Sequence, residues 1–311
     1  MTIMNFKTIC SLGTGTMGSG IAVVFAMAGY DVHMFGRSEE SIKKGFDSIE
    51  SILKTYAEYG LISLGQIPEI TDKIKGLTAL DEAAEGADFV IEAVSEDLDI
   101  KQNIFSALDT LCQPHTIFAT STSGISPSLI AEAIDRKDRF IAAHFLNPPH
   151  LMSLVEVIPG KFTSSDTIDL TLKLLEKLGK TPVLLSKDTP GFIVNRLQMA
   201  LMREALSMIE QGAASVESID TTIKHLSRRF SATGLLEGAD LGGLDVFYNI
   251  ADYLMEDLCN STGIPASLVK AKETGNLGAK TGQGFYNWTD ANKINEIKKL
   301  RDDILFSWLK K

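Results

Sequence analysis

Two alternating patterns of apolar and polar positions run along the chain up to about residue 188. Continuous apolar runs of strand length, such as 89–94 and 140–143, are separated by longer segments whose apolar residues recur at three- and four-residue spacing. Continuous runs are typical of parallel strands buried on both faces, and the spaced pattern is typical of amphipathic helices. Because strands alternate with helices, the pattern predicts a doubly wound parallel sheet.

The pattern changes near residue 188. Before it we expect strands at 9–12, 31–35, 89–94, 116–120, 140–143, 155–158 and 182–185, with helices at 21–28, 39–61, 98–111, 127–133 and 166–178. After it the pattern is helical at 192–212, 216–227, 244–259 and 292–310, without a convincing strand. We therefore predict an α/β domain over residues 1–187 and an all-α domain over residues 188–311.

A glycine-rich turn lies between the first strand and the first helix. Gly13, Gly15 and Gly18 have the spacing G-x-G-x-x-G, with Thr16 and Met17 inside the motif. The first glycine permits a tight turn, the second lets a pyrophosphate approach the backbone, and the third allows close packing of helix on strand. The N-terminus of the helix adds free N–H groups and a positive dipole end. The context predicts dinucleotide binding by a Rossmann-type domain, in preference to a turn that binds nothing.

The composition limits which binding partners and which cellular compartment we expect for this protein. The 311 residues carry a formal charge of −10, which argues against nucleic acid or an anionic membrane as a partner. The three cysteines, Cys10, Cys112 and Cys259, are far apart, so we expect free thiols in a reducing compartment and no metal site. The first residues lack a basic region followed by a cleavable apolar stretch, so we expect no signal peptide and a cytoplasmic protein.

A polar cluster follows a predicted strand at His144, Asn147 and His150, and Glu156 lies twelve positions after His144 in an apolar run. A carboxylate in such a run is costly unless it is paired, and a nearby imidazole would serve. A histidine oriented by a carboxylate is a common general base near neutral pH. The alternative is a core histidine and a solvent-facing glutamate, and spacing alone leaves the two interpretations about equal.

Two neutral polar residues are further candidates. Ser123 lies at the entry to a predicted helix and Asn195 near the start of the second domain. Both supply neutral hydrogen-bonding groups, although a helix cap and a surface amide are the simpler interpretations. The sequence contains no G-x-S-x-G motif, which argues against nucleophilic acyl chemistry.

Taken together, motifs over nearly the whole chain resemble the L-3-hydroxyacyl-CoA dehydrogenase family. In chain order they are Gly13-Thr-Gly-Thr-Met-Gly18, Val90-Ile-Glu-Ala-Val94, Glu96 with Lys101, Thr120-Ser-Thr-Ser-Gly-Ile125, His144-Phe-Leu-Asn-Pro148, Leu154-Val-Glu-Val157, Asp188-Thr-Pro-Gly-Phe-Ile-Val-Asn-Arg196, Ala239-Asp-Leu-Gly-Gly-Leu-Asp245 and Lys280-Thr-Gly-Gln-Gly-Phe-Tyr286.

The resemblance implies an NAD(P)-dependent oxidoreductase of fatty acid metabolism, with a helical domain that dimerises and closes over a short-chain 3-hydroxyacyl-CoA. It implies that His144 takes the proton of the 3-hydroxyl and that Glu156 orients the imidazole. It further implies that Ser123 and Asn195 bind the reacting oxygen. The residues that would hold the nicotinamide side of the cofactor are Glu96, Lys101 and Asn147.

The first departure from the family concerns the cofactor. The family usually has an acidic residue after the second strand, where it hydrogen-bonds the adenosine ribose, but here Phe35 is followed by Gly36, Arg37 and Ser38. Without the carboxylate there is no repulsion of a 2′-phosphate, which Arg37 and Ser38 could bind. We therefore predict a preference for NADP(H) over NAD(H). The alternative is a tolerated Gly36 beside a solvated Arg37.

The second departure concerns the acyl carrier. CoA-specific members offer a serine and a lysine to CoA from the helical segment after the second strand, and Ile52 and Tyr59 align with them here. Lys43, Lys44 or Lys54 could replace the missing cation. The stretch 147–156 is also similar to carnitine and gulonate dehydrogenases, so a free 3-hydroxy acid is the second hypothesis. A non-catalytic dinucleotide-binding sensor or structural protein is the third.

Overall fold

The computed structural model describes residues 6–310, and the chain folds into two compact units. The first unit comprises the chain up to Asn195 together with the residues from Arg301 onward, and the second is Arg196–Leu300. The C-terminal segment thus returns to the first unit, a feature that the predicted domains 1–187 and 188–311 do not include. Residues 1–5, where we expect no leader, lie outside the described range.

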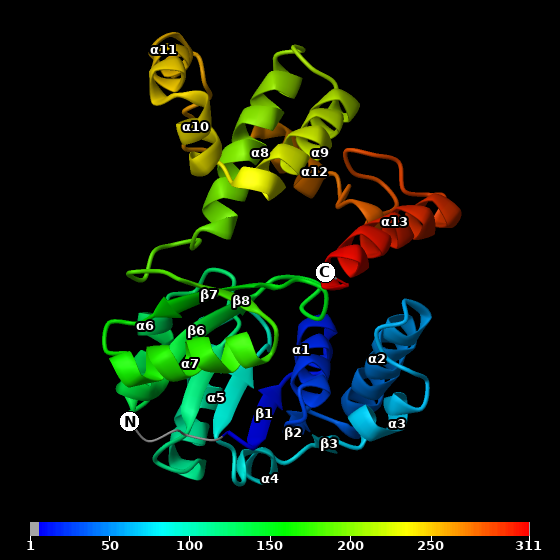
Figure 1. Cartoon of the computed structure of the whole chain (residues 1–311), viewed down its shortest axis with the longest axis vertical. Helices are drawn as coiled ribbons and strands as arrows, with labels where there is room; N and C mark the ends of the chain where they lie inside the picture. The colour runs from blue at the N-terminus through cyan, green and yellow to red at the C-terminus, as the bar shows by residue number, and fades with distance from the viewer. Residues whose placement is uncertain (1–5, 311) are drawn as a thin grey trace. The chain divides into compact units, whose positions relative to one another are not determined.

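An eight-stranded sheet forms the centre of the first unit, in the order β3-β2-β1-β4-β5-β6-β7-β8 (Figure 1). The strands are β1 (Thr8–Leu12), β2 (Asp31–Phe35), β3 (Ile74–Leu77), β4 (Phe89–Glu92), β5 (Ile117–Thr120), β6 (Phe140–Phe145), β7 (Leu154–Pro159) and β8 (Thr181–Leu184). All neighbouring pairs are parallel except β6 and β7, which are antiparallel. The strand order reverses between β1 and β4, the switch point at which doubly wound folds bind ligands.

Helices surround the sheet and make up the second unit. Those up to residue 177 are α1 (Thr16–Met27), α2 (Glu39–Glu58), α3 (Gln66–Thr71), α4 (Leu80–Ala84), α5 (Leu98–Leu111), α6 (Pro127–Ile130) and α7 (Ser165–Lys177). The later ones are α8 (Val194–Glu210), α9 (Val216–Thr233), α10 (Leu236–Gly242), α11 (Leu244–Leu254), α12 (Ala266–Glu273) and α13 (Ala291–Leu309). No helix among these described residues is long and apolar enough to cross a membrane.

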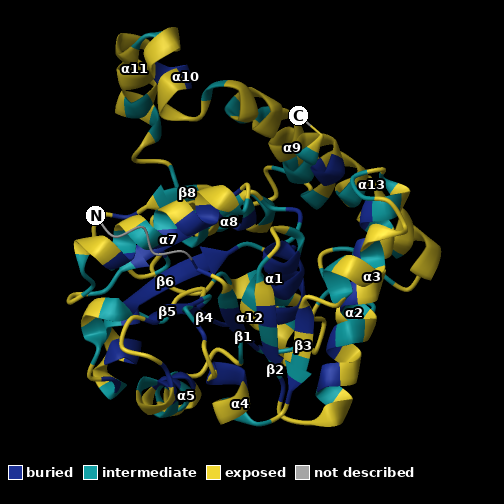
Figure 2. Cartoon of the chain, turned by 60° about the horizontal axis from the view of Figure 1, so that its bottom comes forward, coloured by how far each residue is buried: buried dark blue, intermediate teal, exposed yellow. Residues whose placement is uncertain are grey.

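The central strands carry the core of the first unit. Every residue of β4, β5 and β6 is buried, and the strands appear dark blue in Figure 2. Helix α1 buries a continuous run from Gly18 to Ala26 against the sheet. Burial on both faces explains why these strands read as unbroken apolar runs.

The predicted α/β class, with an all-helical segment after it, is confirmed. Two features differ from the prediction. Strand β7 runs against its neighbour β6, so the sheet is mostly rather than wholly parallel. The pattern also missed β3 and four helices, α3, α4, α10 and α12, because each is short and only partly buried.

The C-terminal end of α13 packs on the first unit through aromatic residues. The Phe306 ring stacks on Tyr59, which follows α2 directly, with centroids 4.1 Å apart, and it meets Tyr56 of α2 edge-on at 5.2 Å. Leu151 and Leu305 are buried in the same cluster, and the Tyr59 hydroxyl donates a hydrogen bond to Asp303. This segment therefore covers part of the α2 surface.

The second unit buries little of its apolar surface. In this fully described unit, Leu206 and Ala239 are the only buried hydrophobic residues. By contrast, Leu236, Leu241 and Tyr253 are more than two-thirds exposed, and helices α10 and α11 are largely yellow in Figure 2. An apolar hollow of about 690 Å³ also lies between helices of this unit. Such surfaces normally mark an interface.

Candidate active site

The glycine turn is built for close backbone approaches. Gly13 has φ +116°, and a Cβ there would lie 2.6 Å from the Ala93 carbonyl oxygen. A Cβ on Gly18 would lie 2.1 Å from the oxygen of Gly13, so helix α1 can begin here only on glycine. In contrast, a Cβ on Gly15 would meet nothing within 4 Å. The open side of Gly15 leaves room for a phosphate against the backbone.

The N-terminus of α1 has no side-chain cap. Its cap residue is Gly15, which has no side chain to accept a hydrogen bond from the helix, and the first turn contains no acidic residue. Free N–H groups and the helix dipole at such an end favour an anion. Together with the open space at Gly15, this end of α1 fits the pyrophosphate of a dinucleotide.

The end of β2 holds the residues that we expect to choose between cofactors. A Cβ on Gly36 would lie within 3 Å of Ser41, Thr14 and Ile42 side chains, so an acidic side chain could not be added without movement. The Ser38 hydroxyl caps α2 by accepting a hydrogen bond from the Ser41 N–H. Arg37 is exposed and makes no ion pair within the described range. Of the two side chains predicted to meet a phosphate, Arg37 is the free one.

His144 and Glu156 face each other across β6 and β7. They are register partners, and the antiparallel pairing places both side chains on one face of the sheet. His144 Nδ1 lies 2.8 Å from Glu156 Oε2, and the two side chains are 5% and 1% exposed. The bond to Nδ1 leaves Nε2 as the other ring nitrogen, which can exchange a proton with a ligand.

The second oxygen of Glu156 anchors the start of α8. Oε1 accepts hydrogen bonds from the backbone N–H groups of Ile193 at 2.7 Å and Val194 at 3.0 Å. Phe192, just before them, has φ +52° and packs its ring 5.5 Å from the His144 imidazole. The carboxylate is therefore satisfied at both oxygens despite its burial, as a buried charge must be.

Asn195 and Ser123 are brought together by the same turn of α8. The Asn195 amide nitrogen donates to the Ser123 carbonyl at 2.6 Å. The Ser123 hydroxyl makes no hydrogen bond to any residue in the described part of the chain. Thus one helical turn links the imidazole–carboxylate pair to the Ser123 turn, and it leaves the serine hydroxyl available.

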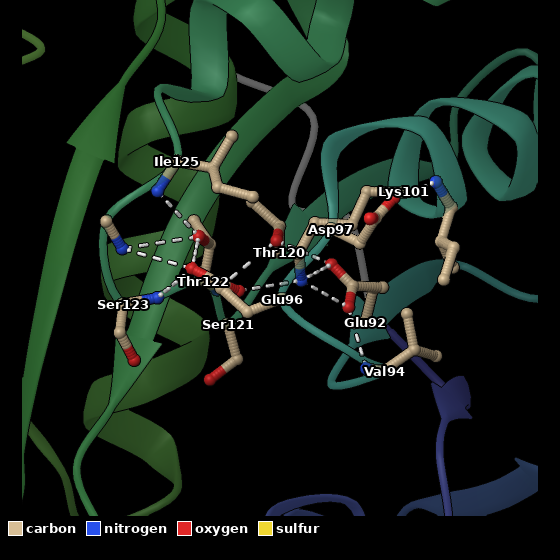
Figure 3. Close-up of polar contacts among 12 residues, drawn as sticks. Glu92, Val94, Glu96, Asp97, Lys101, Thr120, Ser121, Thr122, Ser123 and Ile125 are labelled. Atoms are coloured by element: carbon tan, nitrogen blue, oxygen red, sulfur yellow. Dashed lines mark hydrogen bonds and ion pairs between the residues drawn. The ribbon is translucent and has the colours of Figure 1, made fainter. Parts of the chain in front are cut away.

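A second cluster of charges lies beside that turn (Figure 3). Lys101 is 1% exposed, and its ammonium contacts Glu92 Oε1 at 2.7 Å and Glu96 Oε2 at 3.2 Å. Glu96 Oε1 accepts hydrogen bonds from the Thr122 hydroxyl and the Ser123 N–H. Burial raises the pKa of Glu96, but the hydrogen bond from Thr122 and the charge of Lys101 outweigh burial, and the net pKa is lowered.

Asn147 is exposed and begins a tightly held loop. Buried Lys180 donates from Nζ to the carbonyls of Pro149 at 2.7 Å and Met152 at 2.9 Å. Tyr56 donates to the carbonyl of His150 at 2.5 Å. Burial lowers the pKa of Lys180 to about 8, and burial and then the Lys180 charge lower the pKa of His150 to about 4.

The structure thus groups most of the predicted residues at neighbouring strand ends and leaves some apart. Hydrogen bonds join His144 to Glu156, Asn195 to Ser123, and Ser123 to Glu96, which in turn forms an ion pair with Lys101. Asn147, Arg37 and Ser38 make no bond to this group among the described residues. The sequence analysis gave no role to Glu92, Thr120, Thr122, Tyr56 or Lys180. Glu92 had a signal, since it too is a carboxylate in an apolar run.

Comparison with known families identifies both parts of the chain. Residues 8–189 match the model described as 3-hydroxyacyl-CoA dehydrogenase, NAD binding domain. Residues 191–288 match the model described as 3-hydroxyacyl-CoA dehydrogenase, C-terminal domain. Helix α13 follows the second match.

Individual proteins agree with this result. The chain is 38% identical over 288 residues to a probable 3-hydroxybutyryl-CoA dehydrogenase of Bacillus subtilis, covering 92% of this chain and 99% of that one. Among solved structures, (S)-3-hydroxybutyryl-CoA dehydrogenase PaaH1 from Ralstonia eutropha is 34% identical with TM-score 0.76, covering 92% of this chain and 100% of that one. A 5-formyl-3-hydroxy-2-methylpyridine 4-carboxylic acid 5-dehydrogenase, described as an NAD⁺-dependent dismutase, is 28% identical with TM-score 0.90, covering 98% of each chain. The chain belongs to the 3-hydroxyacyl-CoA dehydrogenase family.

Proposed function

We propose that this member of the 3-hydroxyacyl-CoA dehydrogenase family interconverts a short-chain L-3-hydroxyacyl-CoA and its 3-oxoacyl-CoA. The observation that carries the proposal is the buried His144–Glu156 pair, 2.8 Å apart, in a chain of this family. A protein that only binds a dinucleotide has no need of an oriented base. The 3-hydroxybutyryl-CoA dehydrogenase of Bacillus subtilis, at 38% identity, supports the substrate class.

In the oxidative direction, His144 Nε2 accepts the proton of the substrate hydroxyl. The bond from Nδ1 to Glu156 fixes the ring orientation and stabilises the imidazolium that forms. The free Ser123 hydroxyl and Asn195 hydrogen-bond the same oxygen. Since the oxygen develops carbonyl character as it loses its proton, fixed donors around it lower the barrier in both directions.

When bound, a nicotinamide dinucleotide accepts or supplies the hydride at substrate C3. The chain's part is to hold it: the Gly13, Gly15 and Gly18 turn takes the pyrophosphate, with Thr16 and Met17 in the first turn of α1. Glu96, Lys101 and Asn147 then belong to the nicotinamide side, and Lys101 contributes from a buried position.

We further propose that NADP(H) is preferred over NAD(H). Exposed Arg37 and the absence of a carboxylate at Gly36 support this preference, while Ser38 is engaged as a helix cap. The test compares kcat/KM for the two cofactors in the wild type and in Arg37→Ala. We expect Arg37→Ala to lose activity with NADP(H) by about tenfold, equivalent to one charge-assisted contact, and to change little with NAD(H). A wild type that strongly prefers NAD(H) would overturn the proposal.

A free acid is the second candidate substrate, and one feature favours it. The end of α13 covers α2 at Tyr56 and Tyr59, and the position aligned with the lysine of CoA-specific members is Tyr59, stacked on Phe306. The solved structure with TM-score 0.90 is named for a pyridinecarboxylic acid and also matches 98% of this chain. A covered α2 surface with an aromatic in place of a cation suits a substrate without CoA.

A substrate panel separates the candidates. Absorbance of the reduced cofactor is followed with acetoacetyl-CoA, longer 3-oxoacyl-CoAs and free 3-oxo acids, with His144→Ala as the control for specific turnover. Higher kcat/KM for the thioesters supports the first candidate, and higher kcat/KM for the free acids supports the second. No turnover with either set would favour the non-catalytic binding protein instead.

We also propose a homodimer formed through the second unit, in the cytoplasm. The exposed apolar residues of α10 and α11, including Leu241 at 80%, support a second copy as the partner that covers them. Light scattering should give twice the 33.8 kDa of one chain. Leu241→Glu should shift the mass toward one chain, and a wild-type monomer would contradict the proposal.

Buried, free Cys10 and Cys112 fit a reducing compartment.

A further inference from the structure

The charges beside the Ser123 turn form a closed ring of hydrogen bonds and ion pairs (Figure 3). Lys101 Nζ contacts both oxygens of Glu92, at 2.7 and 2.9 Å. Glu92 Oε2 accepts from the Thr120 hydroxyl at 2.6 Å, and this hydroxyl accepts from the Thr122 N–H at 3.2 Å. The Thr122 hydroxyl donates a hydrogen bond to Glu96 Oε1, and Glu96 Oε2 forms an ion pair with Lys101, which closes the ring.

The two buried members of the ring, Glu92 and Lys101, contact each other closely. The Lys101 ammonium contacts both oxygens of Glu92 and one oxygen of Glu96, so it bridges the two carboxylates. Each oxygen of Glu92 accepts twice, since Oε1 also takes the Val94 N–H at 2.7 Å. Lys101 is 1% exposed and Glu92 is fully buried, so this pair is shielded from solvent.

Glu96 connects the ring to the reacting site. It is 45% exposed, and its Oε1 accepts from the backbone N–H groups of Ser123 at 3.0 Å and Gly124 at 3.2 Å. Glu96 follows β4, whereas Ser123 follows β5, so this carboxylate joins the two loops at the carboxyl edge of adjacent strands. Where Glu96 lies therefore determines where Ser123 lies.

We propose that Glu92 is a positioning residue of this enzyme, which acts through Lys101 and Thr120 to hold Glu96 and thereby the Ser123 hydroxyl at the substrate oxygen. Lys101 links Glu92 to Glu96 in this arrangement. The proposal rests on the proposed function for the identity of the reacting oxygen, but the rigidity of the turn can be measured without any substrate.

The first measurement is backbone hydrogen exchange over residues 121–125. In the wild type the amides of Thr122, Ser123 and Gly124 are bonded to the ring, so they should exchange slowly. Glu92→Gln keeps the shape but removes the charge that holds Lys101, and we expect exchange in this segment to rise by about tenfold or more. Unchanged exchange would overturn the inference, whatever the activity assays give.

The matched control removes a different ion pair on the same helix. Asp109 of α5 holds Arg136 at 2.6 Å, away from the Ser123 turn in the hydrogen-bond network. Asp109→Asn should loosen residues 133–139 and leave exchange at 121–125 at the wild-type rate. If Asp109→Asn loosens 121–125 as much as Glu92→Gln does, the effect is general destabilisation and the inference fails.

The second measurement is a double-mutant cycle with Ser123→Ala, read as kcat on the best substrate of the panel. A displaced serine hydroxyl should lower kcat by about 10- to 100-fold in Glu92→Gln. Once the hydroxyl is absent, Glu92→Gln should cost less than about twofold more, whereas Asp109→Asn should combine additively with Ser123→Ala. Additivity of Glu92→Gln with Ser123→Ala would reject the positioning role.

A milder variant keeps the test available if Glu92→Gln does not fold. Thr120→Val removes the hydroxyl that bridges Glu92 and Thr122 while leaving every charge in place. It should reproduce both effects in weaker form, and its failure to alter either would also count against the proposal. Absence of turnover in the wild type would refute the proposed function alone, because hydrogen exchange still decides whether the ring holds the turn.

Discussion

Replacing Phe306 with alanine tests whether the C-terminal segment is an integral part of the first unit. Phe306 is 1% exposed; it packs edge-on against Tyr56 of α2 and stacks on Tyr59, the residue after α2. It also packs in the cluster that contains Leu151 and Leu305. Truncation would remove the ring from all these neighbours at once.

The expected cost follows from these contacts. Truncating a buried phenylalanine to alanine typically costs about 3–5 kcal/mol, of which each aromatic pair contributes about 0.5–1.5 kcal/mol beyond its buried area. If docking of residues 301–310 is weaker than this cost, the segment detaches before the sheet unfolds. In that case the substitution lowers the free energy of global unfolding by no more than the free energy with which residues 301–310 dock on the first unit. The surface of α2 that they covered then becomes exposed.

Urea unfolding and hydrogen exchange distinguish these outcomes, and Trp308→Ala is the matched control. Trp308 is an aromatic residue in the same helical turn but is 56% exposed, so its removal should change stability by less than about 0.5 kcal/mol. Phe306→Ala should either lower the unfolding free energy by about 3 kcal/mol or more, or accelerate exchange over residues 52–60 and 301–310. Phe306→Ala behaving like Trp308→Ala in both measurements would refute the reasoning.

Three further predictions concern titratable groups. Glu156→Gln should lower kcat by about 10²–10⁴-fold with little change in KM, because an amide cannot stabilise the imidazolium; a kcat within threefold of wild type would contradict this. The pKa of His150 falls to about 4 in the folded protein, so as the pH drops below 6.5 the unfolded chain protonates this histidine before the folded one does. The free energy of unfolding of the wild type should therefore fall between pH 6.5 and pH 4, by at most about 1.4 kcal/mol per pH unit. His150→Gln should flatten this dependence in urea titrations at pH 4.5, 5.5 and 7, and equal slopes would count against the assignment. Burial lowers the pKa of Lys180 from 10.5 to about 8 in the folded protein. Between pH 8 and pH 10.5 the unfolded chain therefore holds more protons than the folded one, and the free energy of unfolding should rise with pH. Lys180→Met should lack that gain in unfolding experiments at pH 8, 9 and 10, and a gain as large as in the wild type would exclude Lys180 as its source.

The sequence predicted the fold well where burial is complete and poorly where it is partial. Strands β4, β5 and β6 are buried on both faces, so their apolar runs are unbroken and easily recognised. Strand β3 is four residues long, and Lys75 within it is exposed, so it leaves almost no pattern. Docking of the C-terminal segment was not predictable either, because the Tyr59–Asp303 bond joins positions 244 residues apart.

Two carboxylates buried in strands show how far sequence reasoning reaches into the site. The cost of burying a charge predicted a partner for Glu156, and His144 is that partner. The same reasoning applies to Glu92, which ends the apolar run of β4 and pairs with Lys101. The run does not identify this partner, because nothing in it shows that a lysine nine positions later, on the next helix, turns back to the strand.

The chemistry of each partner then separates the roles of the two carboxylates. An imidazole beside a carboxylate can gain and lose a proton near neutral pH, so the Glu156 pair suits proton transfer. An ammonium that bridges two carboxylates joins the segments that carry them, so the Glu92 pair suits fixing a loop. The Glu92 pair lies at the end of β4 and the Glu156 pair lies on β6 and β7, yet both lead to the same place: Glu156 through the first turn of α8 to Asn195, and Glu92 through Glu96 to Ser123. Since Asn195 also donates to the Ser123 carbonyl, the serine turn is held from two sides by two buried carboxylates, only one of which is placed to exchange a proton. A rule that finds buried carboxylates in strands therefore finds positioning and catalytic groups alike, and the identity of the cation beside each one distinguishes them.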